Sequence, residues 1–462
     1  MSAPTDPGER MTAESGDEAA AEIRAAADRI MAAGESGGRW ARDPVNLPVI
    51  ENWTEAIGDA NPVYSDAEFA AASVHGSLVA PPAMTQVWTM MGQAAAGRGG
   101  GDPTGQMVSL LDAAGYTGVV ATNADHVFHR YLRHGERVQV RVALVGLTGP
   151  KRTALGEGWF FTTRQTWYSD GEAVAAMDFR ILKFRPHGAP PAGGQPQPPA
   201  VPPMRPVVTQ DTAFFWDGTA KGELRIQRCD GCGALRHPPG PMCPRCGAAA
   251  PGYVVAAGTG TVYSYVVHHH PPVPGKKLPL VIALVELDEG VRVLAEMPGV
   301  RPEQVSVGMP AEIGFLRIDD ELTLPAWRPA GPDLLPEMVV DVSTTFVVAS
   351  ALATRDFTPV HHDRDLAVAN GSKDIFLNIL TDTGLVQRFV SQWAGPQALL
   401  REISIRLGVP CYAGDTLTFS GRVTERTGLP EGRRCRVEVT GRCGLGDHVI
   451  ATALVDIPGG AS

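Results

Sequence analysis

Four cysteines in a narrow window constrain the fold of this chain more than any other feature. Cys229 and Cys232 form one C-x-x-C pair, and Cys243 and Cys246 form a second pair after ten intervening residues. Each pair can place two thiolates on one side of a tight turn, so two such turns complete a tetrahedral shell of four sulfurs for Zn2+. A closed shell leaves no open position, so we expect a structural Zn2+. A rubredoxin-type iron site and two vestigial pairs are the alternatives.

The composition limits the class of protein. A length of 462 residues suggests about three domains. Lys and Arg number 40 against 50 Asp and Glu, and this net charge of −10 argues against a nucleic-acid partner, which needs a basic face. The N-terminus has no basic-then-apolar signal pattern, and the longest clean apolar run, residues 278–285, is too short to span a bilayer. We therefore expect a cytoplasmic protein without a membrane partner.

Two Pro-rich stretches divide the chain. Residues 187–206 have a Pro/Gly composition that favours extended conformers and packs no core, so we interpret them as a linker. Residues 325–336 form a second such stretch, which closes the middle domain. The predicted organisation is an N-terminal extension over 1–40 (disordered to about residue 17, then helical over 18–33), followed by domains at 41–186, 207–330 and 338–462.

Hydrophobic patterning predicts strands in all three domains. The first half of the first domain looks helical and loop-rich, and its second half predicts strands at 137–147, 158–168 and 173–184. The middle domain predicts a helix over 211–220 and then a small barrel with strands at 260–267, 280–287, 291–296 and 311–318. The third domain predicts a helix over 373–393 and strands at 402–406, 415–424, 434–442 and 448–457.

The first and third domains share an Asp-x-x-Pro-Val element. It runs from Asp59 to Tyr64 in the first domain and from Asp356 to His361 in the third, and a similar hairpin follows each, which suggests duplication. Asp356 and His361 could share one water, because one can take its proton while the other orients it. Spacing alone favours a polar loop before a helix, and His362 is a second candidate histidine. Tyr64 is a poor base near neutral pH, so the first copy would lack this pair.

These motifs resemble known families. The third domain resembles the MaoC-like (R)-specific enoyl-CoA hydratases, whose Asp-x-Asn-Pro-x-His element has Thr358 in place of Asn here. The first domain is similar to another MaoC-type domain, on residues 59–64 and 79–84. The middle domain resembles the DUF35 family, a zinc ribbon attached to an OB fold, on the four cysteines and residues 258–262 and 283–290. This order resembles the two subunits of the actinobacterial steroid side-chain hydratase joined in one chain.

The resemblance implies a fold and an activity. The fold class would be α+β, with two hot-dog domains forming a double hot dog and an intervening zinc ribbon and all-β OB fold. Asp356 and His361 would be the catalytic pair that adds water to the 2,3 double bond of a steroid-bearing 2-enoyl-CoA. A backbone N–H near Asn378 would stabilise the enolate. Loss of the first domain's histidine would leave space for a bulky acyl group.

The resemblance also implies partners. A coenzyme A thioester would be the substrate, and the DUF35 domain would dock a thiolase-like aldolase. We also expect a homodimer. The alternative function is a non-catalytic acyl-CoA-binding scaffold that recruits the same thiolase-like partner.

Overall fold

The structure is a computed structural model that describes residues 7–92, 101–153, 155–186, 205–249, 251–274, 276, 278–300, 302–319, 321–331 and 333–459, with side chains from residue 18 onward. These residues form two compact units. The first combines 7–186 with 335–459, and the second spans 205–334. The predicted linker over 187–206 lies almost entirely outside the described residues.

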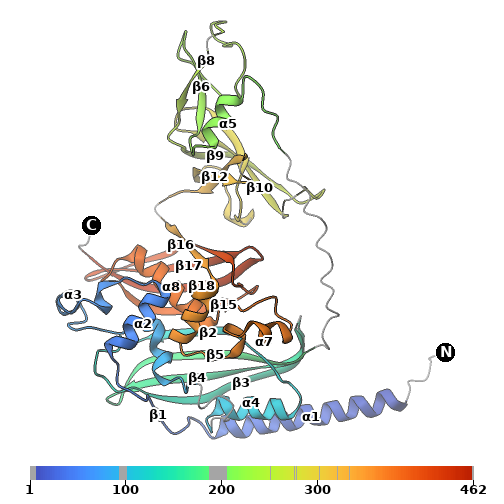
Figure 1. Cartoon of the computed structure of the whole chain (residues 1–462), viewed down its shortest axis with the longest axis vertical. Helices are drawn as coiled ribbons and strands as arrows, with labels where there is room; N and C mark the ends of the chain where they lie inside the picture. The colour runs from blue at the N-terminus through green and yellow to red at the C-terminus, as the bar shows by residue number, and fades with distance from the viewer. Residues whose placement is uncertain are drawn as a thin grey trace. The chain divides into compact units, whose positions relative to one another are not determined.

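One sheet of ten strands extends through the whole first unit (Figure 1). Its order is β1-β3-β4-β5-β2-β15-β18-β17-β16-β14. The strands of the first half are β1 (Arg39–Trp40), β2 (Gly118–Phe128), β3 (Gln139–Thr153), β4 (Gly156–Ser169) and β5 (Glu172–Pro186). Those of the second half are β14 (Leu334–Val342), β15 (Leu399–Leu407), β16 (Asp415–Leu429), β17 (Gly432–Cys443) and β18 (Gly446–Pro458). The halves join where β2 pairs antiparallel with β15.

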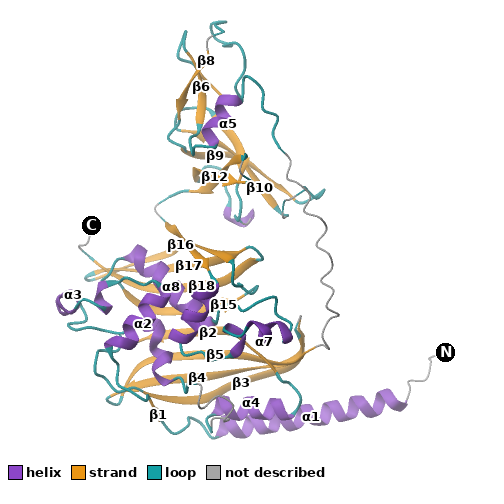
Figure 2. Ribbon diagram, viewed as in Figure 1, coloured by secondary structure: helices purple, strands orange, loops and turns teal. Residues whose placement is uncertain are grey.

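Helices cover this sheet (Figure 2). They are α1 (Pro7–Ala32), α2 (Leu47–Ile57), α3 (Ala67–Ala72), α4 (Pro103–Ala113), α6 (Thr344–Ala353), α7 (Arg364–Ala369) and α8 (Ile379–Ala394), with 3-10 helices η1 (Pro62–Tyr64), η2 (Pro82–Thr89) and η5 (Pro359–His361). The helix α1 begins at Pro7, so the prediction of disorder up to about residue 17 is wrong for the described residues 7–17. No helix among the described residues has both the length and the apolar character needed to cross a bilayer.

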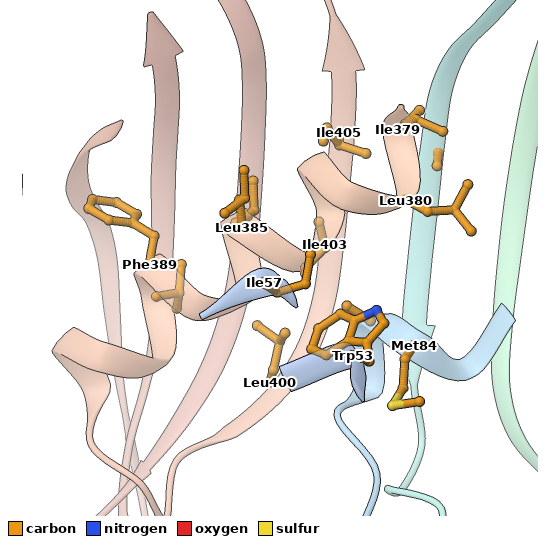
Figure 3. Close-up of a cluster of buried hydrophobic side chains, with 14 of the residues drawn as sticks. Trp53, Ile57, Met84, Ile379, Leu380, Leu385, Phe389, Leu400, Ile403 and Ile405 are labelled. Atoms are coloured by element: carbon orange, nitrogen blue, oxygen red, sulfur yellow. The ribbon is translucent and has the colours of Figure 1, made fainter. Parts of the chain in front are cut away.

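A shared core holds the two halves of the first unit together. The helix α8 of the second half packs against α2 of the first half, and Figure 3 shows Trp53 and Ile57 beside residues of α8 and β15. A Cβ added at Gly384 would lie 2.8 Å from the Trp53 ring, so the close contact of these two helices depends on a glycine here. Residues far apart in the sequence therefore fix the position of α8.

The second unit contains a closed barrel and a smaller sheet. The barrel strands are β9 (Thr259–His268), β10 (Leu280–Leu287), β11 (Arg292–Glu296), β12 (Pro310–Arg317) and β13 (Thr323–Pro329), in the order β10-β11-β13-β12-β9. A three-stranded sheet consists of β6 (Arg225–Cys229), β7 (Leu235–Arg236) and β8 (Pro251–Val255), and the helices are α5 (Ala213–Thr219) and η4 (Pro302–Gln304). The fully buried Trp327 of β13 donates its indole N–H to the Val293 carbonyl of the neighbouring strand β11, at 3.2 Å.

The fold departs from the sequence-based predictions in two places. The long strand β2, at the start of the second half of the first domain, is not among the predicted strands. The Pro-rich stretch over 325–336 contains most of β13 and the start of β14. Prolines are tolerated in β13 because this strand pairs fully only with β12 and meets β11 at a single residue pair, Glu296 with Ala326.

Candidate active site and metal centre

A strained turn at the end of α6 positions Asp356. Arg355 has a φ of 57°, a left-handed conformation that residues other than glycine rarely adopt. The N–H groups of Arg355 and Asp356 both donate to carbonyls of the last helical turn, at 3.0 Å each. In the first half Gly58, with a φ of 74°, makes the same turn before Asp59. The two halves therefore present their aspartates in the same way, and the second half does so at a conformational cost.

Asp356 and His361 form a pair in the second half. The His361 Nε2 atom lies 3.5 Å from Asp356 Oδ2, and the side chains are only 9% and 15% exposed. His361 Nδ1 lies 2.8 Å from the Phe376 carbonyl oxygen. Because a carbonyl only accepts hydrogen bonds, Nδ1 carries a proton, and Nε2 is the nitrogen that faces Asp356. The predicted pair is thus brought together with the imidazole in the tautomer of a base.

Thr358 fixes the second oxygen of Asp356. Asp356 Oδ1 accepts hydrogen bonds from the Thr358 backbone N–H at 3.2 Å and from its hydroxyl at 2.7 Å. In the first half, Asn61 donates its backbone N–H to Asp59 Oδ1 at 3.2 Å. Thr358 therefore keeps the backbone contact of the usual asparagine and adds a hydroxyl contact. Both contacts use Oδ1, which leaves Oδ2 directed toward His361.

His362 points to a different partner. Its Nε2 atom lies 3.2 Å from the Phe357 carbonyl oxygen, and the residue is exposed. His361, by contrast, is buried and stacks edge-on against the Phe376 ring, with ring centroids 5.0 Å apart. Of the two candidate histidines, His361 is the one that the structure places beside Asp356.

Asn378 is the N-cap of α8. Its Oδ1 atom accepts a hydrogen bond from the Thr381 N–H at 2.7 Å, and its amide donates to the Thr354 hydroxyl at 3.1 Å. The side chain is thus engaged in holding the helix start to the end of α6. The N–H groups of Ile379 and Leu380, in the first turn, lie beyond the reach of intrahelical hydrogen bonds. They are unsatisfied donors at the start of α8.

The equivalent site in the first half is closed. Asp59 Oδ2 accepts a hydrogen bond from Gln387 Nε2 at 2.9 Å, and the Ala83 N–H donates to Gln387 Oε1 at 2.8 Å. Tyr64 Oη lies 3.4 Å from the same Nε2 atom. Burial raises the pKa of Asp59, and it raises the pKa of Tyr64 well above its ordinary value, so Tyr64 stays protonated. The first half has Tyr64 where the second half has His361, and we expected this difference to leave space for a bulky acyl group. That space is absent, because Tyr64 and Gln387 fill it.

Sequence reasoning missed Gln387 and a buried ion pair that joins Asp382 of α8 to His448 of β18. His448 Nε2 lies 3.1 Å from Asp382 Oδ1, and both residues are at most 2% exposed. Burial alone would lower the pKa of His448, but the adjacent Asp382 raises it overall. The His448 Nδ1 atom lies 2.7 Å from the Val409 carbonyl. No local motif marks these residues, since their partners are remote in the sequence.

The four cysteines of the second unit form one cluster. Cys229 Sγ lies 3.7 Å from Cys246 Sγ, and Cys232 Sγ lies 3.6 Å from Cys243 Sγ. These separations fit the edges of a tetrahedron, which measure about 3.8 Å for a Zn–S distance of about 2.3 Å. In each turn a glycine N–H donates to the carbonyl of the first cysteine, from Gly233 to Cys229 and from Gly247 to Cys243, as the two predicted turns require. The donor set therefore fits Zn2+.

A second group of potential metal ligands comprises Cys411, Asp415 and Cys443, with ligand atoms within 4.8 Å of one another. Burial raises the pKa of the Cys411 thiol far above its ordinary value. Asp415 Oδ2 already accepts the Tyr412 N–H, at 2.9 Å. We assign no metal to this group.

Family models match three parts of the chain. Residues 34–177 match the dehydratase domain region of FAS1-like proteins, residues 216–252 match the rubredoxin-like zinc ribbon domain of ChsH2, and residues 253–316 match its C-terminal OB-fold domain. A solved structure described as a MaoC-like dehydratase aligns with a TM-score of 0.50 at 18% identity, over 90% of this chain and 97% of that one. The predicted hot-dog, zinc-ribbon and OB-fold architecture is thereby confirmed.

The two subunits of one enzyme are among the curated relatives of this chain. The 3-oxo-4,17-pregnadiene-20-carboxyl-CoA hydratase alpha subunit of Mycobacterium tuberculosis is 51% identical over 308 residues, 67% of this chain and 98% of the relative. The beta subunit of the same enzyme is 62% identical over 120 residues, 26% of this chain and 89% of the relative. A DUF35 domain-containing scaffold protein of Methanocaldococcus jannaschii is 38% identical over 96 residues, 20% of this chain and 68% of the relative.

Proposed function

This chain belongs to the family of the 3-oxo-4,17-pregnadiene-20-carboxyl-CoA hydratases, with the sequences of both subunits in one chain, and on that premise we propose that it hydrates a bulky 2-enoyl-CoA. The names of its relatives favour an acyl group that carries a steroid nucleus. The observation that carries the proposal is the buried Asp356–His361 pair, with His361 Nε2 3.5 Å from Asp356 Oδ2.

The proposed reaction begins with one water bound between Asp356 Oδ2 and His361 Nε2. Both atoms can accept a proton from it, because Thr358 occupies the other oxygen of Asp356 and the Phe376 carbonyl occupies Nδ1 of His361. As one of them removes a proton, the water oxygen bonds to C3 and the electrons of the double bond move toward the thioester. The enolate then takes a proton at C2 from the same face, which restores the pair and completes the addition of water.

The start of α8 is the proposed site for the thioester oxygen. Negative charge grows on this oxygen as the enolate forms, and unsatisfied N–H groups at a helix N-terminus stabilise such charge. The Leu380 N–H is the donor that we assign, with Asn378 as a positioning residue that caps the helix and links it to Thr354. No metal is required by this chemistry.

The second unit is proposed to dock a thiolase-like aldolase. The match to the zinc-ribbon and OB-fold models and the similarity to a protein named as a DUF35 scaffold support a docking role. A non-catalytic scaffold remains the alternative for the whole chain, and the Asp356–His361 pair weighs against it. A homodimer stays a prediction.

The test is an assay of water addition by the purified chain and by its His361→Ala variant. The substrates are a short straight-chain 2-enoyl-CoA and a steroid-bearing one. Histidine-dependent turnover of only the steroid thioester would support both the chemistry and the substrate class. Turnover of only the short thioester would keep the chemistry and remove the steroid. No turnover of either, with the aldolase partner also supplied, would favour the scaffold.

A further inference from the structure

The two hot-dog halves allow a residue-by-residue comparison of their sites. Just before its site helix, each half makes one isolated antiparallel bridge: Val79 with Arg133 in the first half, and Phe376 with Tyr412 in the second. The N-caps that follow are Pro81 in the first half and Asn378 in the second. Ala83 and Leu380 are therefore equivalent, since each is the second residue of its helix. Asp59 and Asp356 are equivalent by the turns described above.

Gln387 occupies the inactive site from the other half of the molecule. It lies in α8, two turns beyond Leu380, and has no exposed surface. Its amide nitrogen donates to Asp59 Oδ2 and its amide oxygen accepts from the Ala83 N–H. These are the two hydrogen bonds that an attacking water and a thioester oxygen would make in an open site.

We propose that Gln387 is the resident ligand of the first half-site: its Nε2 atom stands in for the water, and its Oε1 atom stands in for the thioester oxygen. This rests on the proposed function of the second half, whose ligand positions it mirrors. We call the Asp59 carboxylate and the Ala83 N–H the binding frame of the first half. The side-chain amide of Gln387 fills this frame. Each chain consequently offers one hydration site, and restoring a histidine at position 64 alone would not open a second.

The physical chemistry of the frame explains why it must be filled. Asp59 is 6% exposed, and a buried carboxylate without a hydrogen-bond donor is strongly unfavourable. The Ala83 N–H lies at a helix start and needs an acceptor from outside the helix. One primary amide supplies both, because it carries a donor and an acceptor on the same carbon. The class of ligand that this frame accepts is therefore a small primary amide.

This inference is tested by chemical complementation. Gln387→Ala removes a CH2–CONH2 group, which acetamide matches with one additional hydrogen. We expect the variant to melt several degrees below the wild type and to regain part of this loss, in a saturable manner, as acetamide is added. N,N-dimethylacetamide, which lacks an N–H, should not restore it. Wild type and Gln106→Ala, which alters an exposed glutamine bonded to the Gly101 carbonyl, should not respond to acetamide. Equal responses to both amides, or in all three proteins, would overturn the proposal.

A second pair of variants covers the case in which Gln387→Ala does not fold. Gln387→Glu places a carboxylate against Asp59 and should lower the melting temperature at pH 7. Adding Asp59→Asn to it returns one donor to the pair, so the double variant should melt several degrees higher than Gln387→Glu alone. A double variant that melts no higher overturns the proposal. All melts are made without substrate, so a failure of the hydration assay would bear only on the proposed function.

Discussion

A single hydrogen bond decides which nitrogen of His361 can act as a base. The Phe376 carbonyl holds the proton on Nδ1, so Nε2 is left to accept a proton from water beside Asp356. We predict that His361→Ala folds normally and loses about 10²- to 10⁴-fold in kcat, the usual contribution of one general acid–base group. Steady-state hydration kinetics with circular dichroism spectra of both proteins provide the measurement.

The neighbouring histidine is the matched control for this prediction. His362 is exposed and contacts the Phe357 carbonyl, so His362→Ala should retain about half or more of the wild-type kcat. A larger loss of kcat in His362→Ala than in His361→Ala would show that His362 is the base and that the assignment of His361 is wrong.

Tyr64 gives the opposite prediction in the first half. Its hydroxyl lies 3.4 Å from Gln387 Nε2, a weak contact, and burial raises the pKa of the phenol far above neutral pH. Tyr64→Phe should therefore leave kcat within about twofold and cost about 1 kcal/mol of stability. Hydration assays and thermal melts of the variant test this, and a collapse in kcat would mean that the first half is catalytic.

Sequence identified the pair but not its surroundings. Asp356 and His361 are five positions apart, so a local motif could indicate them. The choice between His361 and His362 depends on the carbonyl of Phe376, fifteen positions away from His361. Gln387 and Asp59 are 328 positions apart, and only the tertiary fold brings them together. Local patterns carry no information on such contacts.

At the scale of helices and strands, the alternation of apolar and polar residues predicted most strands. It failed where pairing with neighbouring strands decides the structure. The run over 280–287 was predicted as a strand, and β10 has those bounds with strictly alternating burial. The strand β2 was missed because polar residues such as Asn123 and Asp125 interrupt its pattern, while pairing with β5 and β15 on both sides stabilises it. The strand β13 was not predicted because of its prolines. They are tolerated because β13 pairs with β11 at only one residue pair.

The strand β2 also makes the fold sensitive to acid. Burial lowers the pKa of His126 to about 4, whereas the unfolded chain binds a proton near pH 6.5. The stability that neutral His126 contributes is present above pH 6.5 and is lost as the pH falls toward 4, by roughly 3 kcal/mol. His126→Phe, beside the ring of Phe128, should flatten this dependence.

Urea unfolding at pH 7 and at pH 4.5 measures the effect of His126. The difference in unfolding free energy between the two pH values should be smaller in His126→Phe than in the wild type. His75 and His237, whose pKa values burial also lowers to about 4, keep part of the acid sensitivity in both proteins. An unchanged difference would show that His126 is not the source.

The cysteine cluster fits a metal ion around which its ribbon would fold. Zn2+ would be held by Cys229, Cys232, Cys243 and Cys246, and structural zinc of this kind contributes on the order of 10 kcal/mol to folding its ribbon. We predict one zinc per chain, with Cys243→Ser losing the metal and the ribbon structure. Hydration activity should persist, because the first unit has its own core. Metal analysis and activity assays of the variant test both parts, and iron in place of zinc would contradict the first.

At the scale of the whole molecule, the first unit is one folding entity assembled from two distant stretches of chain. Its main core combines residues of both halves, including Trp53, Ile57 and Met84 from the first and Leu385 and Phe389 from the second (Figure 3). The sheet is continuous through β2 and β15. The relatives divide the same sequence between an alpha and a beta subunit. The covalent connection through the second unit is therefore not what holds the halves together.

This leads to a prediction for a split protein. Residues 1–332 and 333–462, expressed together as two polypeptides, should co-purify and retain most of the hydration activity, because the cut precedes β14 and leaves both sets of strands intact. Residues 333–462 alone should aggregate or stay inactive, since Gly384 and its neighbours on α8 would lose the cover of Trp53 and Ile57.

A matched variant shows whether the shared core is the cause. Gly384→Leu should disrupt the split pair more than the intact chain, because a side chain at this position meets the Trp53 ring at 2.8 Å and only the intact chain keeps the halves at a high effective concentration. The measurement is the hydration rate of four proteins: the intact chain and the split pair, each with and without Gly384→Leu. Co-purification is measured for the two split pairs. If residues 333–462 alone were monomeric and fully active, or if Gly384→Leu affected neither form, the halves would be independent domains, and the contact between α2 and α8 would not be what holds them together.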